Sequence, residues 1–332
     1  MTDFKRIRKA VIPAAGFGTR MLPATKALPK EMLPVAAKPM IQYAVEEAAA
    51  AGIETIIFVV RSNKSVIQAH FGPDPELVSL LEQRHQFGAA SAIRRLGEFA
   101  ELRFVEQEKP LGLAHAISCA RSLVGDEPFA VLLPDVIIKA AEPATLQLMH
   151  AYEQHGGSIV AIREIGSQEV ERYGVIRASD MPSSSFGSSI RITQLVEKPL
   201  PSDAPSRWGI FGRYLLEPLI WDVIAETRCG AGGEVQLTDA LNLLCHQRTV
   251  YGFIFEGQHY DTGDPIGYLK ANIELSVHKF QQPLRMYLSR LASEIGCHHF
   301  PSAEDERQSY SCENQRMIST NGIDDSLQPK QV

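Results

Sequence analysis

Two glycines and three cationic side chains gather near the N-terminus, in the stretch AAGFGTRMLPATKALPKEML at residues 14–33. Gly16 and Gly18 carry no side chains, so backbone N–H groups there can approach a ligand closely. Arg20 offers a planar fork of donors and Lys26 a compact point charge, and together these suit a polyphosphate. Because the stretch directly follows the apolar run AVIPA, the pattern predicts an anion cradle after a strand.

Two common phosphate-binding fingerprints do not match this stretch. The dinucleotide fingerprint G-x-G-x-x-G needs a third glycine where Met21 stands, and no acidic ribose ligand follows the next apolar run at the expected place. The Gly-Lys-Ser/Thr of a P-loop is missing as well. A lone glycine pair also fits an ordinary turn with solvated basic residues, so at this point both interpretations stay open.

The overall composition limits the classes of partner. The chain has 332 residues, of which 45% are hydrophobic and 22% charged, as in ordinary globular proteins. A net charge of −6 gives no general basic field, so we expect no nucleic-acid partner and a local cluster for any phosphate. No apolar run suits a signal peptide or a membrane span, and the 5 dispersed cysteines suit reduced thiols. We expect a cytoplasmic protein that acts on small molecules and contacts no membrane.

Strand-like runs alternate with helical patterns through the first half of the chain. Such alternation predicts an α/β fold with a parallel sheet and crossover helices on both faces. Ligands in such sheets bind beyond the carboxyl ends of the strands, which places the glycine pair and Asp135 in one crevice. The runs are AVIPA, TIIFVV, LRFVEQ and FAVLLPD, separated by PMIQYAVEEAAAAG, a helical stretch around residues 66–84, and GLAHAISCARSL.

The second half differs in spacing, which suggests an α+β extension that carries the other part of a site. Its strand-like runs SIVAIREI, YGVIRA, RITQLVEKP and WGIFGRYLL lie closer together than those of the first half. We expect one part at about residues 8–157, a second at 158–280 and a helical segment at 281–300. The polar stretch 181–189 predicts a mobile loop, and 301–332 has too few large apolar residues to order itself.

Several motifs in a fixed order resemble those of one family. The segments KAVIPAAGFGTRMLPATKALPKEMLPV and KPMIQYAVEEA resemble the N-terminal signature of bacterial UTP–glucose-1-phosphate uridylyltransferases, which are sugar-nucleotide nucleotidyltransferases. The signature reads G-x-G-T-R-x-x-P-x-T-K-x-x-P-K. The resemblance continues through PLGLAHAI, VLLPDV, YGVI, VEKP, FGRYLL, GEVQLTDAL and YDTGDPIGYLKA, and it covers about residues 8 to 280.

This resemblance implies a fold and a reaction. The fold would be a Rossmann-like three-layer sandwich with a mainly parallel mixed sheet, in one catalytic domain at residues 1–280. The part before residue 158 would bind the nucleotide and the part after it the sugar. A phosphate oxygen of glucose 1-phosphate would attack the α-phosphorus of UTP in line, giving UDP-glucose and pyrophosphate. Family members use Mg²⁺ and form homodimers or homotetramers.

The resemblance also assigns a nucleotide clamp made mostly of backbone groups. Arg20 and Lys26 would meet the triphosphate as cations. Gln107 would read the base edge through its amide, although a lone glutamine is more often a surface residue. The residues assigned to the nucleotide are Ala14, Ala15, Gly16, Gly18, Thr19, Gln107 and Gly112.

Two aspartates are the expected metal ligands. Asp135 follows the run FAVLLP, where a buried and unpaired carboxylate would be costly, and Mg²⁺ favours carboxylate and phosphate oxygens. The resemblance adds Asp261 in HYDTGDP as a second ligand. The alternative for either aspartate is an ordinary turn. Asp264 is expected to cap a helix.

A second clamp would hold the sugar phosphate. By resemblance Lys198 binds the phosphate, Glu197 accepts hydrogen bonds from sugar hydroxyls, and the backbone at Gly174 meets the hexose ring. Neighbouring strand residues point to opposite faces, so Glu197 and Lys198 can act together only where the strand bends. A solvated Glu-Lys pair is the alternative.

Some positions depart from the family pattern. Glu106 stands where relatives have an arginine, and Arg207 and Trp208 stand where they have an asparagine and a small apolar residue. These changes leave open which sugar and nucleotide are used, as in a thymidylyl- or guanylyltransferase of the same fold. A non-catalytic paralogue that binds sugar nucleotides is a separate alternative. The resemblance predicts catalytic roles for Arg20, Lys26, Asp135 and Lys198.

Overall fold

The computed structural model describes residues 5–61, 65–179 and 185–294. The chain divides into two compact units, residues 1–275 and 276–332. The stretch 301–332, predicted to be a disordered tail, lies outside the described residues, as does part of the predicted loop at 181–189. None of the described helices has the length and apolar character needed to cross a membrane.

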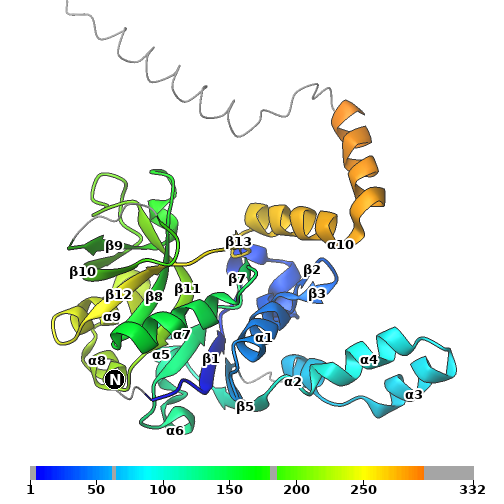
Figure 1. The fold of residues 1–332 in the computed structure, drawn as a ribbon, viewed down its shortest axis with the longest axis horizontal. Coiled ribbons are helices and arrows are strands. Elements are labelled where there is room, and N and C mark those ends of the chain that lie inside the picture. The colour runs from blue at the N-terminus through cyan, green and yellow to red at the C-terminus, as the bar shows by residue number, and fades with distance from the viewer. Residues whose placement is uncertain (1–4, 62–64, 180–184, 295–332) are drawn as a thin grey trace, which may run out of the picture. The chain divides into compact units, whose positions relative to one another are not determined.

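The described part of the first unit is built on a nine-stranded sheet (Figure 1). In spatial order its strands are β5 (Glu101–Glu106), β4 (Thr55–Val60), β1 (Lys9–Ala14), β6 (Phe129–Leu132), β11 (Trp208–Leu216), β8 (Ser158–Glu164), β12 (Val250–Ile254), β10 (Ser189–Glu197) and β9 (Gly174–Ala178).

Strand direction changes half-way across this sheet. The strands β5, β4, β1 and β6 run parallel to their neighbours, whereas β11 pairs antiparallel with both β6 and β8. Among the described strands, only β8 and β12 pair in parallel beyond that point. The α/β class and the mixed sheet are confirmed, but a mainly parallel arrangement holds only for the first four strands. The cause is connection length, because parallel pairs need long crossovers while β9 and β10 are close in sequence.

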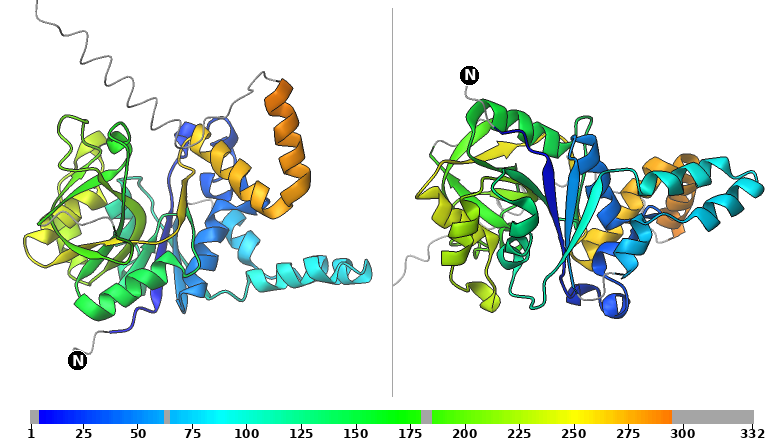
Figure 2. Two further views of the ribbon diagram at one scale, coloured as in Figure 1. Left: turned by 45° about the horizontal axis from the view of Figure 1, so that its top comes forward. Right: turned by 90° about the horizontal axis from the view of Figure 1, so that it is seen from below.

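Helices cover both faces of the sheet, as the two views in Figure 2 show. Alternate residues of β1 face opposite ways: Ala10 and Ile12 join one apolar cluster, and Val11 joins the other. The first cluster includes residues of α1 (Met40–Ala50), α2 (Ser65–Phe71) and α7 (Ala144–His155). The second includes residues of α5 (Leu113–Ser118), α6 (Arg121–Val124), α8 (Ile220–Glu226) and α9 (Leu237–Cys245).

The predicted helical stretch at 66–84 is two helices, α2 and α3 (Pro75–Gln83). The break lies at Gly72 and Pro73, since proline disfavours a helical residue before it. Asp74 then caps α3 by accepting a hydrogen bond from the Leu77 N–H at 2.9 Å. A further helix, α4 (Phe87–Leu96), follows and forms a hairpin with α3 that was not predicted (Figure 1).

Short elements complete the first unit. Two small sheets pair β2 (Pro34–Val35) with β3 (Lys38–Pro39) and β7 (Val136–Lys139) with β13 (Gln258–Asp261). Five 3₁₀ turns are described: η1 (Thr19–Met21), η2 (Ala24–Lys26), η3 (Lys30–Met32), η4 (Val170–Arg172) and η5 (Ala231–Gly233).

The last described helix, α10 (Pro265–Glu294), begins in the first unit and continues in the second. Asp264 caps it, as predicted, by accepting a hydrogen bond from the Gly267 N–H at 2.9 Å. The helix is interrupted at Gln281, where φ is 44°. The segment predicted to be helical at 281–300 is therefore helical as far as the structure describes it.

Candidate active site

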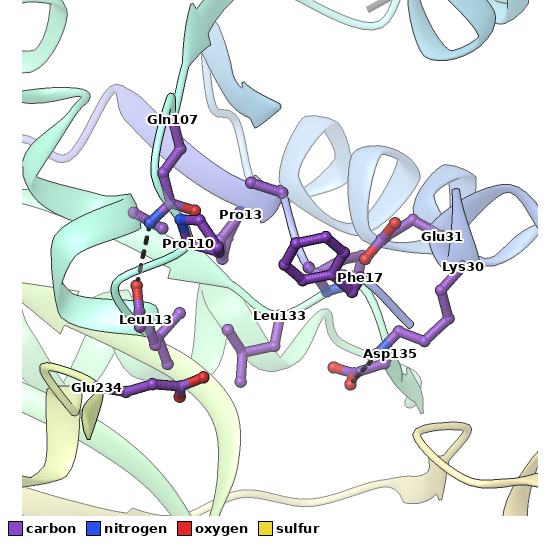
Figure 3. A pocket seen from close by; sticks show the side chains of 15 residues that line it. Pro13, Phe17, Lys30, Glu31, Gln107, Pro110, Leu113, Leu133, Asp135 and Glu234 are labelled. Carbon is purple, nitrogen blue, oxygen red and sulfur yellow. Dashed lines mark hydrogen bonds and ion pairs between the residues drawn. The ribbon is translucent and has the colours of Figure 1, made fainter. Parts of the chain in front are cut away.

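A pocket of about 260 Å³ opens beyond the carboxyl ends of β5, β1 and β6. Figure 3 shows Lys30 and Asp135 joined at one end of it, with Gln107 and Glu234 toward the other. The predicted crevice therefore brings Gly16 and Asp135 together, although they are far apart in sequence, whereas Gly18 lies outside its lining. The lining residues that were predicted from sequence are Ala15, Gly16, Gln107, Gly112 and Asp135.

Gly112 and Gln107 form one wall of this first pocket. Gly112 has a φ of 106°, and a Cβ there would lie 2.6 Å from the carbonyl oxygen of Val235, so only glycine fits. Gln107 is 5% exposed and donates from its amide nitrogen to the Gly112 carbonyl at 3.3 Å. The same nitrogen lies 2.8 Å from Nδ1 of His115. The amide is thus held in place at the pocket wall.

Glu31 lines the same pocket and was not predicted. Its side chain is buried, its Oε2 has no hydrogen-bond partner, and burial raises the pKa of the carboxyl. A buried oxygen without a donor costs free energy, so a ligand hydroxyl that donated to Glu31 would be favoured. The available signal was its place directly after the last lysine of the signature motif, Lys30, and before the apolar Met32 and Leu33.

Lys30 is the second residue that sequence reasoning missed. Its Nζ lies 2.7 Å from Oδ2 of Asp135, and the two side chains are 13% and 23% exposed. Although burial opposes both ionised forms, each charge stabilises the other, which lowers the pKa of Asp135 and raises that of Lys30. Lys30 is the final lysine of the signature motif, so the motif itself held the signal.

A second pocket, of about 530 Å³, meets the first at Asp135. The two pockets also share Leu113, Leu133 and Glu234. A pair of adjoining cavities can hold two ligands side by side, with Asp135 at their junction. The lining residues of the second pocket that were predicted from sequence are Arg20, Asp135, Gly174, Glu197, Lys198 and Asp261.

Glu197 and Lys198 both line the second pocket because the chain bends between them. Lys198 has a φ of 43°, so it leaves the extended conformation of β10. Its Nζ lies 3.1 Å from Oε1 of Glu197, and Oε2 of Glu197 accepts a hydrogen bond from Thr238 at 2.6 Å. A Cβ on Gly174 would lie 2.8 Å from Oγ1 of Thr238, so a larger residue there would displace the hydroxyl that bonds Glu197.

Two carboxylates converge near Gly263. A Cβ on this glycine would lie 2.9 Å from Oδ1 of Asp261, 3.4 Å from Oδ2 of Asp135 and 3.6 Å from Nη2 of Arg20. Nη2 of Arg172 also contacts Oδ2 of Asp261 at 2.7 Å. No cluster of three metal-ligating side chains occurs in the described parts of the chain. Two carboxylates without a full protein cage fit Mg²⁺, which takes its other oxygens from phosphate and water.

The remaining predicted residues lie around the two pockets without lining them. Ala14 is buried at the end of β1, and Gly18 has a φ of 62°. Thr19 is exposed on η1. Lys26 is exposed on η2, whereas Lys30 points to Asp135. The structure thus brings Lys30 to the junction of the pockets and leaves Lys26 outside their lining.

Comparison with known proteins agrees with this geometry. The sequence profile of the nucleotidyl transferase family matches residues 9–277. The chain belongs to this family. It is 46% identical over 273 residues to UTP–glucose-1-phosphate uridylyltransferase 2 of Staphylococcus saprophyticus, an alignment that covers 82% of this chain and 93% of that protein. The resemblance seen in the sequence motifs is confirmed.

Solved structures of nucleotidyl transferases show the same fold. A UDP-glucose pyrophosphorylase complexed with UDP-glucose is 38% identical, with a TM-score of 0.74, and the match covers 80% of this chain and 97% of that one. A UTP-bound UGPase from Acinetobacter baumannii is 37% identical, with a TM-score of 0.77, and the match covers 87% and 99%. Both alignments span nearly the whole of the solved chains.

Proposed function

We propose that the protein is a UTP–glucose-1-phosphate uridylyltransferase, which forms UDP-glucose and pyrophosphate from UTP and glucose 1-phosphate. The observation that carries this proposal is the pair of pockets that meet at Asp135. One pocket has the glycine-lined wall of a nucleotide site, and the other has Glu197 and Lys198 for a sugar phosphate. The names of the relatives supply the identity of both substrates.

In this proposal the first pocket holds UTP. The base lies against Ala15 and Gly16, with the amide of Gln107 at its polar edge. The unpartnered oxygen of Glu31 accepts a hydrogen bond from a ribose hydroxyl, which satisfies the buried carboxylate. The triphosphate extends toward Lys30, and Arg20 supplies a further cation from the neighbouring pocket.

The second pocket holds glucose 1-phosphate. Lys198 pairs with the sugar phosphate, and Glu197, oriented by Thr238, accepts hydrogen bonds from sugar hydroxyls. A phosphate oxygen then forms a bond to the α-phosphorus of UTP, while the bond from that phosphorus to the α–β bridging oxygen breaks. Pyrophosphate leaves with that oxygen. No protein nucleophile takes part, so the chain contributes position and positive charge.

Asp135 and Asp261 are the residues that would hold Mg²⁺ in this site. When bound, the ion would neutralise charge on the phosphate oxygens. The convergence of both carboxylates near Gly263, where a methyl group would collide with Asp261, supports this assignment. The Lys30 ammonium, 2.7 Å from Oδ2 of Asp135, adds positive charge beside these carboxylates.

The finer description of fold and assembly belongs to the same proposal. Helices on both faces of the sheet support a Rossmann-like three-layer sandwich. The division into a nucleotide half and a sugar half is supported by the first pocket, which draws most of its lining from residues before 158. A homodimer or homotetramer in the cytoplasm stays a prediction from the family resemblance.

A substrate-panel assay tests the proposed reaction. Pyrophosphate release is measured with UTP, dTTP and GTP, each paired with several sugar 1-phosphates, with and without Mg²⁺. We expect the pair of UTP and glucose 1-phosphate to give the highest kcat/KM, by about tenfold or more over other nucleotides, and to need the metal. A preference for dTTP or GTP would overturn the substrate assignment. Binding of UTP without turnover of any pair would instead support a non-catalytic paralogue.

A further inference from the structure

Arg213, on strand β11, is buried to 1% exposure although it carries a permanent charge. Its Nε and Nη2 form a bidentate pair with the carboxylate of Glu47 on α1, at 3.0 and 2.8 Å. Glu47 also accepts hydrogen bonds from the N–H and Oγ1 of Thr145. Replacing a buried ion pair by apolar residues is often neutral or stabilising, so stability alone does not account for this one.

Arg213 also donates to three backbone carbonyls: that of its neighbour Gly212, at 3.1 Å from Nη1, and two at the ends of a single turn. Nη1 donates to the carbonyl of Leu133 at 3.1 Å, and Nη2 donates to the carbonyl of Val136 at 2.9 Å. The turn between them is closed by a hydrogen bond from the Val136 N–H to the Leu133 carbonyl. Between these two ends lie Pro134 and Asp135. The guanidinium therefore holds both ends of the turn that carries Asp135.

Thr262 is hydrogen-bonded to the middle of the same turn. Its N–H and its Oγ1 both donate to the Asp135 carbonyl, at 2.8 and 2.7 Å, and the residue is fully buried. Thr262 directly follows Asp261, which pairs with Val136 across β13 and β7. With the backbone carbonyls of Leu133, Asp135 and Val136 all bonded, the turn has little freedom to rotate.

We propose that Arg213 is a positioning residue that acts through the Leu133–Val136 turn to hold Asp135 where the two pockets meet. This inference rests on the proposed function, because Asp135 is the residue it serves. Arg213 lines neither pocket, so it has no contact with either substrate. The planar fork of arginine reaches carbonyls and a carboxylate at once, which neither lysine nor an apolar side chain can do.

The paired variant Glu47→Gln/Arg213→Met tests this role. It removes both buried charges together, so no unpaired charge remains in the core, and the side-chain amide introduced on α1 would still accept from Thr145. We expect kcat to fall about 10- to 100-fold and the affinity for Mn²⁺, followed by electron paramagnetic resonance with and without UTP, to weaken about tenfold or more. KM for UTP and for glucose 1-phosphate should change by less than about threefold, because Arg213 contacts neither.

Two further variants keep the test decisive. Thr262→Val removes only the hydroxyl donor to the Asp135 carbonyl, so it loosens the turn even if the paired variant does not fold. Phe129→Leu is the control for lost stability, because Phe129 is buried at the start of β6 and stacks on Trp221, away from the turn. We expect Thr262→Val to lower kcat and Mn²⁺ affinity in the same direction as the paired variant, and Phe129→Leu to preserve both.

The outcomes separate this inference from the proposed function. A folded paired variant or Thr262→Val protein with the kcat and Mn²⁺ affinity of the unaltered chain would overturn the positioning role. Equal losses in Phe129→Leu at matched stability would also overturn it, since the effect would then be general. An unaltered chain that transfers no nucleotide in any assay refutes the proposed function, whereas Mn²⁺ binding to the variants still decides whether Arg213 organises the carboxylates.

Discussion

Lys30 and Asp135 form an ion pair in the site, and each compensates the charge of the other. The contact of 2.7 Å keeps both groups ionised across the neutral range, because the pKa of Asp135 is lowered and that of Lys30 is raised. Because the pKa of Asp135 is lowered, its ionisation stabilises the folded protein at pH values above the ordinary pKa of 3.8. This stabilisation is lost as the pH falls through the lower pKa of the folded state. Lys30 is thus held ready beside the position proposed for phosphate.

Lys30→Met should therefore harm catalysis more than Lys26→Met. Loss of a preorganised cation from a site of this kind typically lowers kcat by about 10² or more. Lys26 is exposed and lies outside both pocket linings, so its replacement should have a smaller effect. Steady-state rates of UDP-glucose formation by the two variants give the comparison. A larger loss in Lys26→Met would show that Lys26 moves into the reacting complex, as the sequence motif predicts.

Glu31→Gln should stabilise the folded protein at neutral pH and weaken its binding of UTP. The pKa of Glu31 is raised by burial, so its contribution to stability is present below the ordinary value of 4.5 and is lost as the pH rises through the folded-state pKa. At neutral pH the substitution should raise the free energy of unfolding by about 1 kcal/mol while it weakens UTP binding. Denaturant unfolding should show that Glu31→Gln is more stable than the unaltered chain at pH 7.5 and that this difference is smaller at pH 5. A loss of stability at pH 7.5 would contradict this account.

Strand β13 is the element that brings Asp261 to Asp135, and it carries a histidine, His259, that responds to pH. Its ring centroid lies 4.2 Å from that of Phe211 on β11. Burial, helped by the charge of Arg163, lowers the pKa of His259 to about 4. The ionised form of this side chain is therefore disfavoured in the folded protein.

Stability should fall as the pH drops from 6.5 to about 4, because the unfolded chain takes up a proton on this histidine before the folded one does. His259→Phe replaces the imidazole by an aromatic ring that cannot take up a proton. The free energy of unfolding of this variant should therefore fall less between pH 6.5 and about 4. Urea unfolding at half-unit pH steps measures how the free energy of unfolding changes with pH in the unaltered chain and in the variant. Identical slopes in the two proteins would show that His259 is not the group that titrates.

Strands buried on both faces were predictable because they read as solid apolar runs, as TIIFVV does for β4. Helix α4 was missed although FGAASAIRRL is amphipathic, with Ala90 and Leu96 on its buried face, so the sequence signal was present and was overlooked. The residues that contact Asp135 were harder to predict. Lys26 and Lys30 both stand in 3₁₀ turns, and only tertiary packing decides that Lys30 is the one that reaches Asp135. The bond from Arg213 to Val136 joins residues 77 positions apart, which no local pattern reveals.

Within the first unit, the first pocket lies at the ends of the parallel strands and the second is lined by residues of β9, β10 and β11, and the two share Asp135. Lys198→Ala should then weaken the use of glucose 1-phosphate far more than the binding of UTP. A charge-assisted contact contributes about 1.5 to 3 kcal/mol, so KM for the sugar phosphate should rise more than tenfold. KM for each substrate, measured with the other saturating, provides the check. Equal losses for both substrates would argue against separate pockets.

The most direct test of the proposed reaction is the turnover of Asp135→Asn beside that of the unaltered chain, at saturating UTP, glucose 1-phosphate and Mg²⁺. The unaltered chain should release UDP-glucose and pyrophosphate in equal amounts. The variant should fold but lose about 100-fold or more in kcat, since Asp135 stands at the junction of both pockets. Unchanged turnover in Asp135→Asn, or no UDP-glucose from the unaltered chain, would contradict the account.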